Sequence, residues 1–317
     1  MFWGGLRIML KRKEYHQFTV EPCTPAIGGR IKGCHLSELD ETGAADLRDA
    51  LWEYGVLFAT KQHLSFEQMK QTAHIFGERL EEHTFAPTMA EEGHPEVVKI
   101  ERLKGSSAKT TTDIWHHDVV SRTHPNIMSI LQADQVPFGA DTMWASMTAA
   151  YDRLPYAMKL LFANLMIEHD SLYLALRHDF GGSGITPESM AALAESAVHP
   201  AVVSHHATNR PCLFVGNGHV KRVSGYPTDF SEYIIKMANE LPKIPELQVR
   251  HKWEAGDVAM WDNFGTAHYG VTADLADQDR LLHRVAAWSE KVVPYQDRET
   301  VMQSLASDLS SFEQAAE

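Results

Sequence analysis

The chain has 317 residues, of which 44% are hydrophobic and 22% charged, as is ordinary for a globular protein with a sizeable core. Its net charge is −13 and it contains no run of five basic residues, so we expect no nucleic-acid partner. No apolar stretch approaches the roughly 18 residues of a membrane span, and we therefore expect no membrane partner.

The cysteines and the first residues indicate the compartment. Cys23, Cys34 and Cys212 are scattered, odd in number and without C-x-x-C spacing, which argues against a disulfide framework and a cysteine-bound zinc. In "MFWGGLRIMLKRKEY" the basic residues follow the apolar ones, so we expect no signal peptide. The sequence predicts a cytoplasmic protein whose natural start is either Met1 or Met9.

The N-terminal part alternates helix and strand signals. "ETGAADLRDALWEYG" (41–55) has apolar residues at helical spacing and ends on Gly55, which suits a C-cap. "VLFA" (56–59) predicts a short strand. The next helix should begin at Ser65, because Gln68 follows it at capping-box spacing.

From about residue 95 the pattern changes to short strands with two helical interruptions. We expect strands over 96–103, 113–120, 126–134, 201–207, 212–216, 247–253, 257–262 and 280–290, helices around 147–164 and 230–241, and a long loop over 172–197 that includes a helix from Pro187. Such a series predicts a mostly β sandwich or barrel with the helices packed outside it. No repeat or linker divides the chain, so we expect one domain over 1–317. It would contain a helix and strand part (about 20–95), a β core (about 95–291) and a tail (292–317).

The stretch "TTDIWHHDVV" (111–120) contains a candidate metal site. Side chains alternate along a strand, so His116 and Asp118 would share one face and His117 would point to the other. Two histidines and a carboxylate on one face suit non-haem Fe(II) and leave three positions open. In a chain with 18 histidines an H-x-D triplet is weak by itself, and polar residues on a half-exposed strand are the alternative.

The third ligand must come from another segment. His268, in "DVAMWDNFGTAHYGV", follows an apolar strand and a turn and is the candidate that its context favours. Five other histidines compete with it at this point: His205, His206, His219, His251 and His283.

The strand "DRLLHRVAAW" contains a candidate anion site. Arg280 and Arg284 would share one face of it, and two neighbouring guanidinium groups are costly to bury without anions. They predict either a forked site for carboxylates or an exposed arginine pair on an edge strand.

Four motifs in order, "WHHDV", "FGADTMW", "WDNFGTAHYGV" and "DRLLHRV", resemble the TauD/TfdA family of Fe(II)- and 2-oxoglutarate-dependent dioxygenases, and the resemblance extends from about Val20 to Lys291. It implies a double-stranded β-helix (jelly-roll) core with flanking helices. It also implies that His116, Asp118 and His268 bind iron.

The same resemblance implies roles for four further residues. Arg280 would hold the distal carboxylate of 2-oxoglutarate, and Thr142 would donate a hydrogen bond to the same end. Arg284 and His83 would contact an anionic group of the substrate. Where taurine enzymes carry asparagine upstream of Trp115, this chain has "KTTTDI", which disfavours taurine itself.

The reaction that the resemblance implies is the oxidation of a C–H bond of a small anionic substrate with Fe(II), 2-oxoglutarate and O2. The product would be hydroxylated, with or without later C–S or C–O cleavage, and succinate and CO2 would be released. A jelly-roll metal sensor without turnover and a zinc hydrolase with the same triad are the alternatives, and the presence of Arg280 and Thr142 argues against both. Relatives are often dimers or tetramers, so we expect a homo-oligomer.

Overall fold

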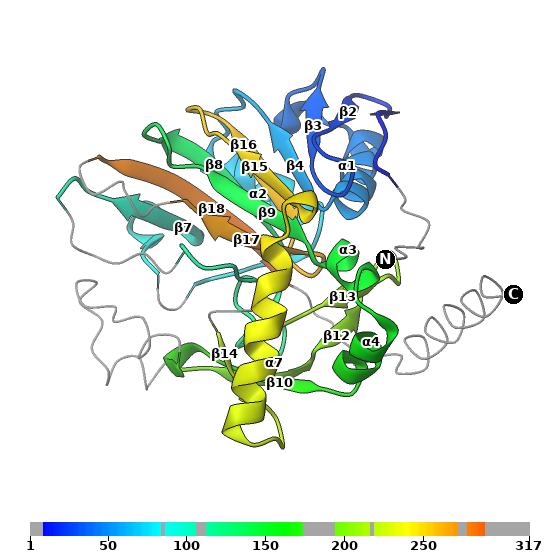
Figure 1. Ribbon diagram of the computed structural model, residues 1–317. Helices are drawn as coiled ribbons and strands as arrows, with labels where there is room; N and C mark the ends of the chain where they lie inside the picture. The colour runs from blue at the N-terminus through cyan, green and yellow to red at the C-terminus, as the bar shows by residue number, and fades with distance from the viewer. Residues whose placement is uncertain are drawn as a thin grey trace, which may run out of the picture.

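A computed structural model describes residues 9–83, 86–105, 112–173, 194–215, 219–271 and 278–288. In Figure 1 a large fanned sheet lies above several smaller strand groups, and helices pack against the outside of both. Of the helices within the described segments, none combines the length and hydrophobicity that crossing a bilayer requires. The helix expected from Pro187 and the tail 292–317 lie outside the described residues.

The large sheet has ten strands, and most neighbours are antiparallel. Its order is β1 (Lys13–Glu14), β2 (Thr19–Pro22), β3 (Gly29–Lys32), β4 (Val56–Ala59), β16 (Val258–Asp262), β8 (Asn126–Gln135), β18 (Arg280–Trp288), β7 (His94–Arg102) and β6 (Thr88–Met89), with β5 (Arg79–Leu80) paired to β18. The predicted strands over 96–103, 126–134, 257–262 and 280–290 are therefore found in one sheet.

A second β layer faces this sheet. It contains β15 (Gln248–His251), β9 (Thr142–Ser146) and β17 (Thr266–Gly270). Two smaller sheets extend the layer: β11 (Ser196–Pro200), β10 (Met166–Asp170) and β14 (Val220–Val223), and the pair β12 (Val202–Ser204) and β13 (Pro211–Leu213).

Aromatic residues fill the space between the two layers. Phe58 of β4 lies edge-on to Trp144 of β9 at a centroid distance of 5.4 Å, and Trp144 lies 5.8 Å from Trp261 of β16. Trp144 and Trp261 are fully buried, and Trp115 is buried beside Tyr269. Trp115, Trp144 and Trp261 therefore belong to the core.

Two helices cover the other face of the large sheet. α1 (Glu41–Tyr54) ends at Gly55, whose φ of 73° suits glycine, and α2 (Phe66–His74) starts at the predicted capping box of Ser65 and Gln68. Leu47, Leu51 and Met69 of these helices are buried against apolar residues of the sheet. Short 3₁₀ helices, η1 (Leu36–Glu38) and η2 (Ala90–Glu92), lie in the adjoining connections.

Three further helices pack against the second layer and the small sheets. They are α3 (Met147–Asp152), α4 (Tyr156–Ala163) and α7 (Thr228–Glu240), the long yellow helix of Figure 1, which is followed by η3 (Leu241–Lys243) and η4 (Pro245–Leu247). The helix expected over 147–164 is thus two helices. Pro155 separates them, because a proline disfavours helical backbone at the residue before it.

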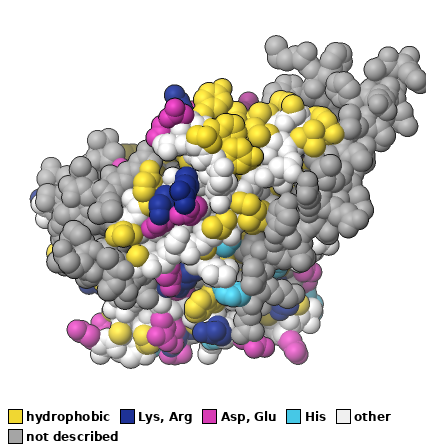
Figure 2. Space-filling model, turned by 90° about the horizontal axis from the view of Figure 1, so that it is seen from below, with side chains coloured by type: hydrophobic (Ala, Val, Ile, Leu, Met, Phe, Trp, Pro, Cys, Tyr) yellow, Lys and Arg dark blue, Asp and Glu magenta, His cyan; other side chains and the backbone are white. Residues whose placement is uncertain are grey.

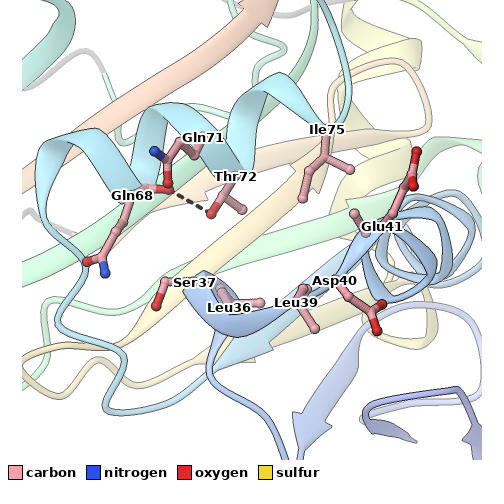
Figure 3. A pocket seen from close by; sticks show the side chains of 10 residues that line it. Leu36, Ser37, Leu39, Asp40, Glu41, Gln68, Gln71, Thr72 and Ile75 are labelled. Carbon is pink, nitrogen blue, oxygen red and sulfur yellow. Dashed lines mark hydrogen bonds between the residues drawn. The ribbon is translucent and has the colours of Figure 1, made fainter.

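A cavity of about 210 Å³ lies between the start of α1, η1 and α2 (Figure 3). Leu36, Asp40 and Gln68 are among its lining residues, and the Thr72 hydroxyl beside them donates to the Gln68 carbonyl oxygen at 2.8 Å. None of the site residues predicted from the sequence lines it. This cavity is separate from the candidate site described below.

The capping box makes the start of α2 testable. Ser65→Ala removes the hydroxyl that accepts from the Gln68 backbone N–H, so we expect the free energy of unfolding to fall by about 1 kcal/mol. Chemical denaturation followed by circular dichroism measures this. Gln71→Ala, an exposed change on the same helix, should leave stability almost unaltered. An equal loss in both variants would contradict the role of the cap.

Candidate active site

Residues 113–120 do not form the strand that the sequence predicts. His116 alone pairs, exchanging backbone hydrogen bonds of 2.9 and 2.8 Å with His268 of β17, and Asp118 then begins a turn. Val119 in this turn has a φ of 51°. A left-handed conformation at a β-branched residue costs about 1–3 kcal/mol and persists only where other contacts hold it.

Asn263, at the end of β16, supplies those contacts. Its fully buried side chain accepts from the Asp118 backbone N–H at 2.8 Å and donates to the Asp118 carbonyl oxygen at 3.0 Å and to the Asn126 carbonyl oxygen at 2.9 Å. The amide thus takes the place of strand pairing at Asp118. Asn263 belongs to the motif "WDNFGTAHYGV", but the sequence did not predict this role for it.

A tight connection from β16 to β17 places His268. Asp262 accepts from the Phe264 backbone N–H at 2.9 Å and, through its own carbonyl, from the Thr266 hydroxyl at 2.7 Å. A Cβ at Gly265 would lie 2.2 Å from Asp262 Oδ2, so any larger residue there would displace the Asp262 carboxylate. The turn carries the chain from the large sheet to the second layer and sets His268 opposite His116.

The structure brings the three predicted metal ligands together. One ligand atom from each of His116, Asp118 and His268 lies within 4.8 Å of the others, and His268 Nε2 is 3.7 Å from Asp118 Oδ1. His116 Nδ1 lies 2.7 Å from the Ile114 carbonyl oxygen. A carbonyl can only accept, so Nδ1 carries the proton and Nε2 is left as the ligand atom.

The competing histidines have other surroundings. His205 Nε2 lies 3.0 Å from Asp262 Oδ2, His251 Nε2 lies 3.2 Å from Asp257 Oδ2, and His283 contacts Asp134. Among the described residues, none of the five competitors belongs to the group that could hold a metal. His117 is fully buried and packs edge-on against Phe214 at 4.9 Å, as expected of a residue that does not face the site.

The protonation states of the triad suit metal binding. Burial alone would raise the pKa of Asp118, but Arg284 and the two histidines outweigh it and hold that pKa below its ordinary value. Burial and the neighbouring His116 hold the pKa of His268 well below its ordinary value. At neutral pH the site therefore presents a carboxylate and a neutral imidazole, the forms that bind metals.

The two oxygens of Asp118 have different partners. Oδ2 accepts from the Ser129 hydroxyl at 2.8 Å and from Arg284 Nη1 at 2.9 Å, whereas Oδ1 is the oxygen nearest His268 Nε2. Arg284 Nη2 donates to Glu81 Oε2 at 2.9 Å. Ser129 and Glu81 were not predicted from the sequence, because neither lies in one of the four motifs.

Arg280 is a buried cation on the same strand as Arg284. It lies opposite Arg102 of β7, and burial together with that neighbour lowers its pKa to about 10. Its Nε has no hydrogen-bond partner, and no carboxylate of the described segments forms an ion pair with it. Thr142 accepts a hydrogen bond of 2.9 Å from Trp253 Nε1, which leaves its own hydroxyl hydrogen to donate elsewhere. No hydrogen bond joins Thr142 to Arg280 in the described part of the chain.

His83 lies beside the Glu81 carboxylate, with Nε2 3.9 Å from Oε1. Its Nδ1 accepts from the Ala86 backbone N–H at 2.9 Å, so a neutral ring carries its proton on Nε2. Burial, helped by Arg284 and Arg122, lowers the pKa of His83 to about 4 despite Glu81. At neutral pH this side chain is therefore an uncharged donor. Figure 2 shows histidine side chains near the middle of the face seen from below.

Comparison with known proteins agrees with this geometry. Residues 19–286 match the family described as taurine catabolism dioxygenase TauD, TfdA family. An alkylsulfatase from Acinetobacter baylyi is 33% identical, covering 86% of this chain and 86% of the relative. An alpha-ketoglutarate-dependent sulfate ester dioxygenase from Pseudomonas putida is 30% identical, covering 86% of this chain and 90% of the relative.

A solved taurine dioxygenase from Burkholderia xenovorans superposes with a TM-score of 0.71 at 29% identity, covering 87% of this chain and 92% of that one. The predicted jelly-roll core with flanking helices is thereby confirmed. Enzymes of this type use Fe(II), 2-oxoglutarate (alpha-ketoglutarate) and O2, and the His–Asp–His group could bind the metal. The chain therefore belongs to the TauD/TfdA family and is an Fe(II)- and 2-oxoglutarate-dependent dioxygenase that acts on a small substrate.

Proposed function

We propose that this dioxygenase oxidises a C–H bond of a small organic anion, and that alkyl sulfate esters are the first substrate class to test. The observation that carries the proposal is the buried group of His116, Asp118 and His268 beside the guanidinium of Arg284. Two relatives point to the sulfate ester class, because one is named an alkylsulfatase and the other a sulfate ester dioxygenase.

His116, Asp118 and His268 would hold the iron. Two imidazole nitrogens and one carboxylate oxygen form the donor set that suits Fe(II) and leaves positions for the cosubstrate and O2. When bound, Fe(II) with 2-oxoglutarate and O2 supplies the oxidising power, with release of succinate and CO2. The protein supplies an Asp118 carboxylate that is 12% exposed, two imidazoles with little exposure to water and a fixed orientation of His116.

Arg280 and Thr142 would bind the distal carboxylate of 2-oxoglutarate. A buried guanidinium that is paired with no carboxylate of the described residues costs free energy, and an incoming carboxylate offsets this cost with paired, charge-assisted hydrogen bonds. The Thr142 hydroxyl, fixed by Trp253, has a hydrogen to donate. A zinc hydrolase or a sensor without turnover would leave this buried cation unexplained.

Arg284 and His83 would contact the anionic group of the substrate. The contacts of Arg284 with Asp118, Ser129 and Glu81 occupy three of the five N–H donors of a guanidinium, and His83 adds a neutral Nε2–H donor. Hydroxylation of the carbon that carries a sulfate oxygen gives a product that collapses to an aldehyde and hydrogen sulfate. A sulfate ester is therefore cleaved although the reaction at the carbon is an oxidation.

The single domain over 1–317 is also a proposal. Its N-terminal strands β1 to β4 join β16, β8 and β18 in one sheet, so the part over 20–95 and the core over 95–291 share a continuous backbone hydrogen-bond network. The homo-oligomer and the cytoplasmic location remain predictions.

The substrate class can be tested by succinate release from 2-oxoglutarate with Fe(II) and ascorbate. We expect alkyl sulfates to stimulate release above the basal rate, with sulfate and succinate formed in equal amounts, and uncharged alcohols of the same chain length to have no such effect. Alkanesulfonates and aryloxyalkanoates complete the panel.

The Asp118→Ala variant tests the assignment of the metal ligands. It should weaken metal binding by at least about 100-fold and abolish turnover while the fold is retained, and Zn(II) added to the parent enzyme should inhibit it. Turnover retained in Asp118→Ala, or activation by Zn(II), would refute the proposed ligands. Equal stimulation of succinate release by the uncharged alcohols would refute the proposal that the substrate is an anion.

The cosubstrate site has a separate prediction. Arg280→Ala removes the cation proposed to pair with the distal carboxylate, so the KM for 2-oxoglutarate should rise roughly 10- to 100-fold, more than the KM for the substrate. Steady-state kinetics with each component varied measures both constants. Arg222→Ala, an exposed arginine of β14 paired with Glu168, is the control and should change neither. An unaltered KM for 2-oxoglutarate in Arg280→Ala would count against this role.

A further inference from the structure

Glu81 is a carboxylate that is 1% exposed and follows directly after β5. Its backbone N–H donates to the Ala286 carbonyl oxygen at 2.9 Å, and Leu80 before it pairs with Ala287 of β18. The strand that carries Arg284 therefore also fixes the backbone of Glu81. The two side chains meet although 203 residues separate them in the sequence.

Three side chains satisfy the Glu81 carboxylate. Oε2 accepts from Arg284 Nη2 at 2.9 Å and from Asn126 Nδ2 at 2.7 Å, and Oε1 accepts from Arg122 Nη1 at 3.3 Å. Arg122 is itself tied to Glu195 by a hydrogen bond of 2.7 Å from Nε. A buried carboxylate with this many charged and polar donors is fixed in place, because every alternative position would leave a buried charge unpaired.

Arg284 connects this buried carboxylate to the proposed metal ligand. Its Nη2 is held by Glu81, and its Nη1 reaches Asp118 Oδ2 at 2.9 Å. A guanidinium is planar, so a contact at one nitrogen restricts the direction of the other. With Oδ2 also held by Ser129, Asp118 has only Oδ1 left to face His268.

We propose that Glu81 is a positioning residue for the iron site, which acts through Arg284 to make Asp118 a ligand through one oxygen only. The inference rests on the proposed ligand role of Asp118. A carboxylate that bound through both oxygens would occupy one of the positions needed by 2-oxoglutarate and O2. Replacing a group that hydrogen-bonds to a metal ligand lowers metal affinity by about 10- to 100-fold. Glu81 contacts the ligand only through Arg284, so we expect a loss at the lower end of that range.

The experiment uses Co(II) alone, with binding measured by calorimetry and the visible spectrum of the bound ion, on the full-length protein. Glu81→Gln removes the charge, and Glu81→Asp keeps the charge but withdraws it from Arg284. Both should weaken Co(II) binding by about tenfold and alter the spectrum. Glu82→Gln, which removes a charge at the exposed neighbouring position, should leave both readings unchanged.

The two Glu81 variants distinguish an effect of the contact with Arg284 from an effect of the negative charge alone. Parent-like affinity in Glu81→Asp with loss in Glu81→Gln would show that only the charge matters and would overturn the proposal. Parent-like affinity in both would also overturn it, as would an equal loss in Glu82→Gln. The failure of the proposed function looks different: Asp118→Ala would then bind Co(II) normally, whatever the Glu81 variants do.

A measurement on the unmutated protein covers the case in which the Glu81 variants do not fold. In a crystal structure of the parent protein with Co(II), the proposal requires Asp118 to bind through Oδ1 alone while the Glu81–Arg284 and Arg284–Asp118 bonds persist. Coordination through both oxygens, or an Arg284 that has left Glu81, would overturn it.

Discussion

The site depends on the different partners of the two carboxylate oxygens of Asp118. One oxygen is bonded by Ser129 and Arg284, and the other lies nearest His268. Four distant segments converge here: β8 supplies Ser129, β18 supplies Arg284, the segment after β5 supplies Glu81, and the end of β16 supplies Asn263, which holds the Asp118 backbone. The strand order of the large sheet therefore also builds the site, because it brings these side chains to the turn that contains Asp118.

Local signals were sufficient for the N-terminal elements. Gly55 ends α1 and Ser65 begins α2 as the sequence predicts, since a C-cap glycine and a capping box act within a few residues of the chain. The triad was also predicted, but the alternation argument for it was wrong. His116 and Asp118 converge because Asp118 lies in a turn with Val119 in a left-handed conformation, and not because a strand runs through them.

The residues that hold the turn and its contacts could not be predicted from local sequence signals. Asn263 contacts Asp118 across 145 residues, and Glu81 contacts Arg284 across 203. No periodicity or short motif encodes a contact of that length, because the contact exists only once the strand order is fixed. The apolar, β-branched residues around His116 favour a strand by propensity, but the strand predicted over 113–120 does not form, because the side-chain hydrogen bonds from Asn263 outweigh that preference.

The two arginines of β18 have different electrostatic surroundings in a chain of net charge −13. Arg284 is balanced by the carboxylates of Asp118 and Glu81, so an anion that approaches it meets two negative charges as well as one positive charge. Arg280 faces Arg102 across the sheet, and no described carboxylate forms an ion pair with it. Electrostatics alone would therefore draw a doubly charged cosubstrate to Arg280 more strongly than to Arg284. The balanced Arg284 remains beside the proposed metal ligands, where orientation matters more than net attraction.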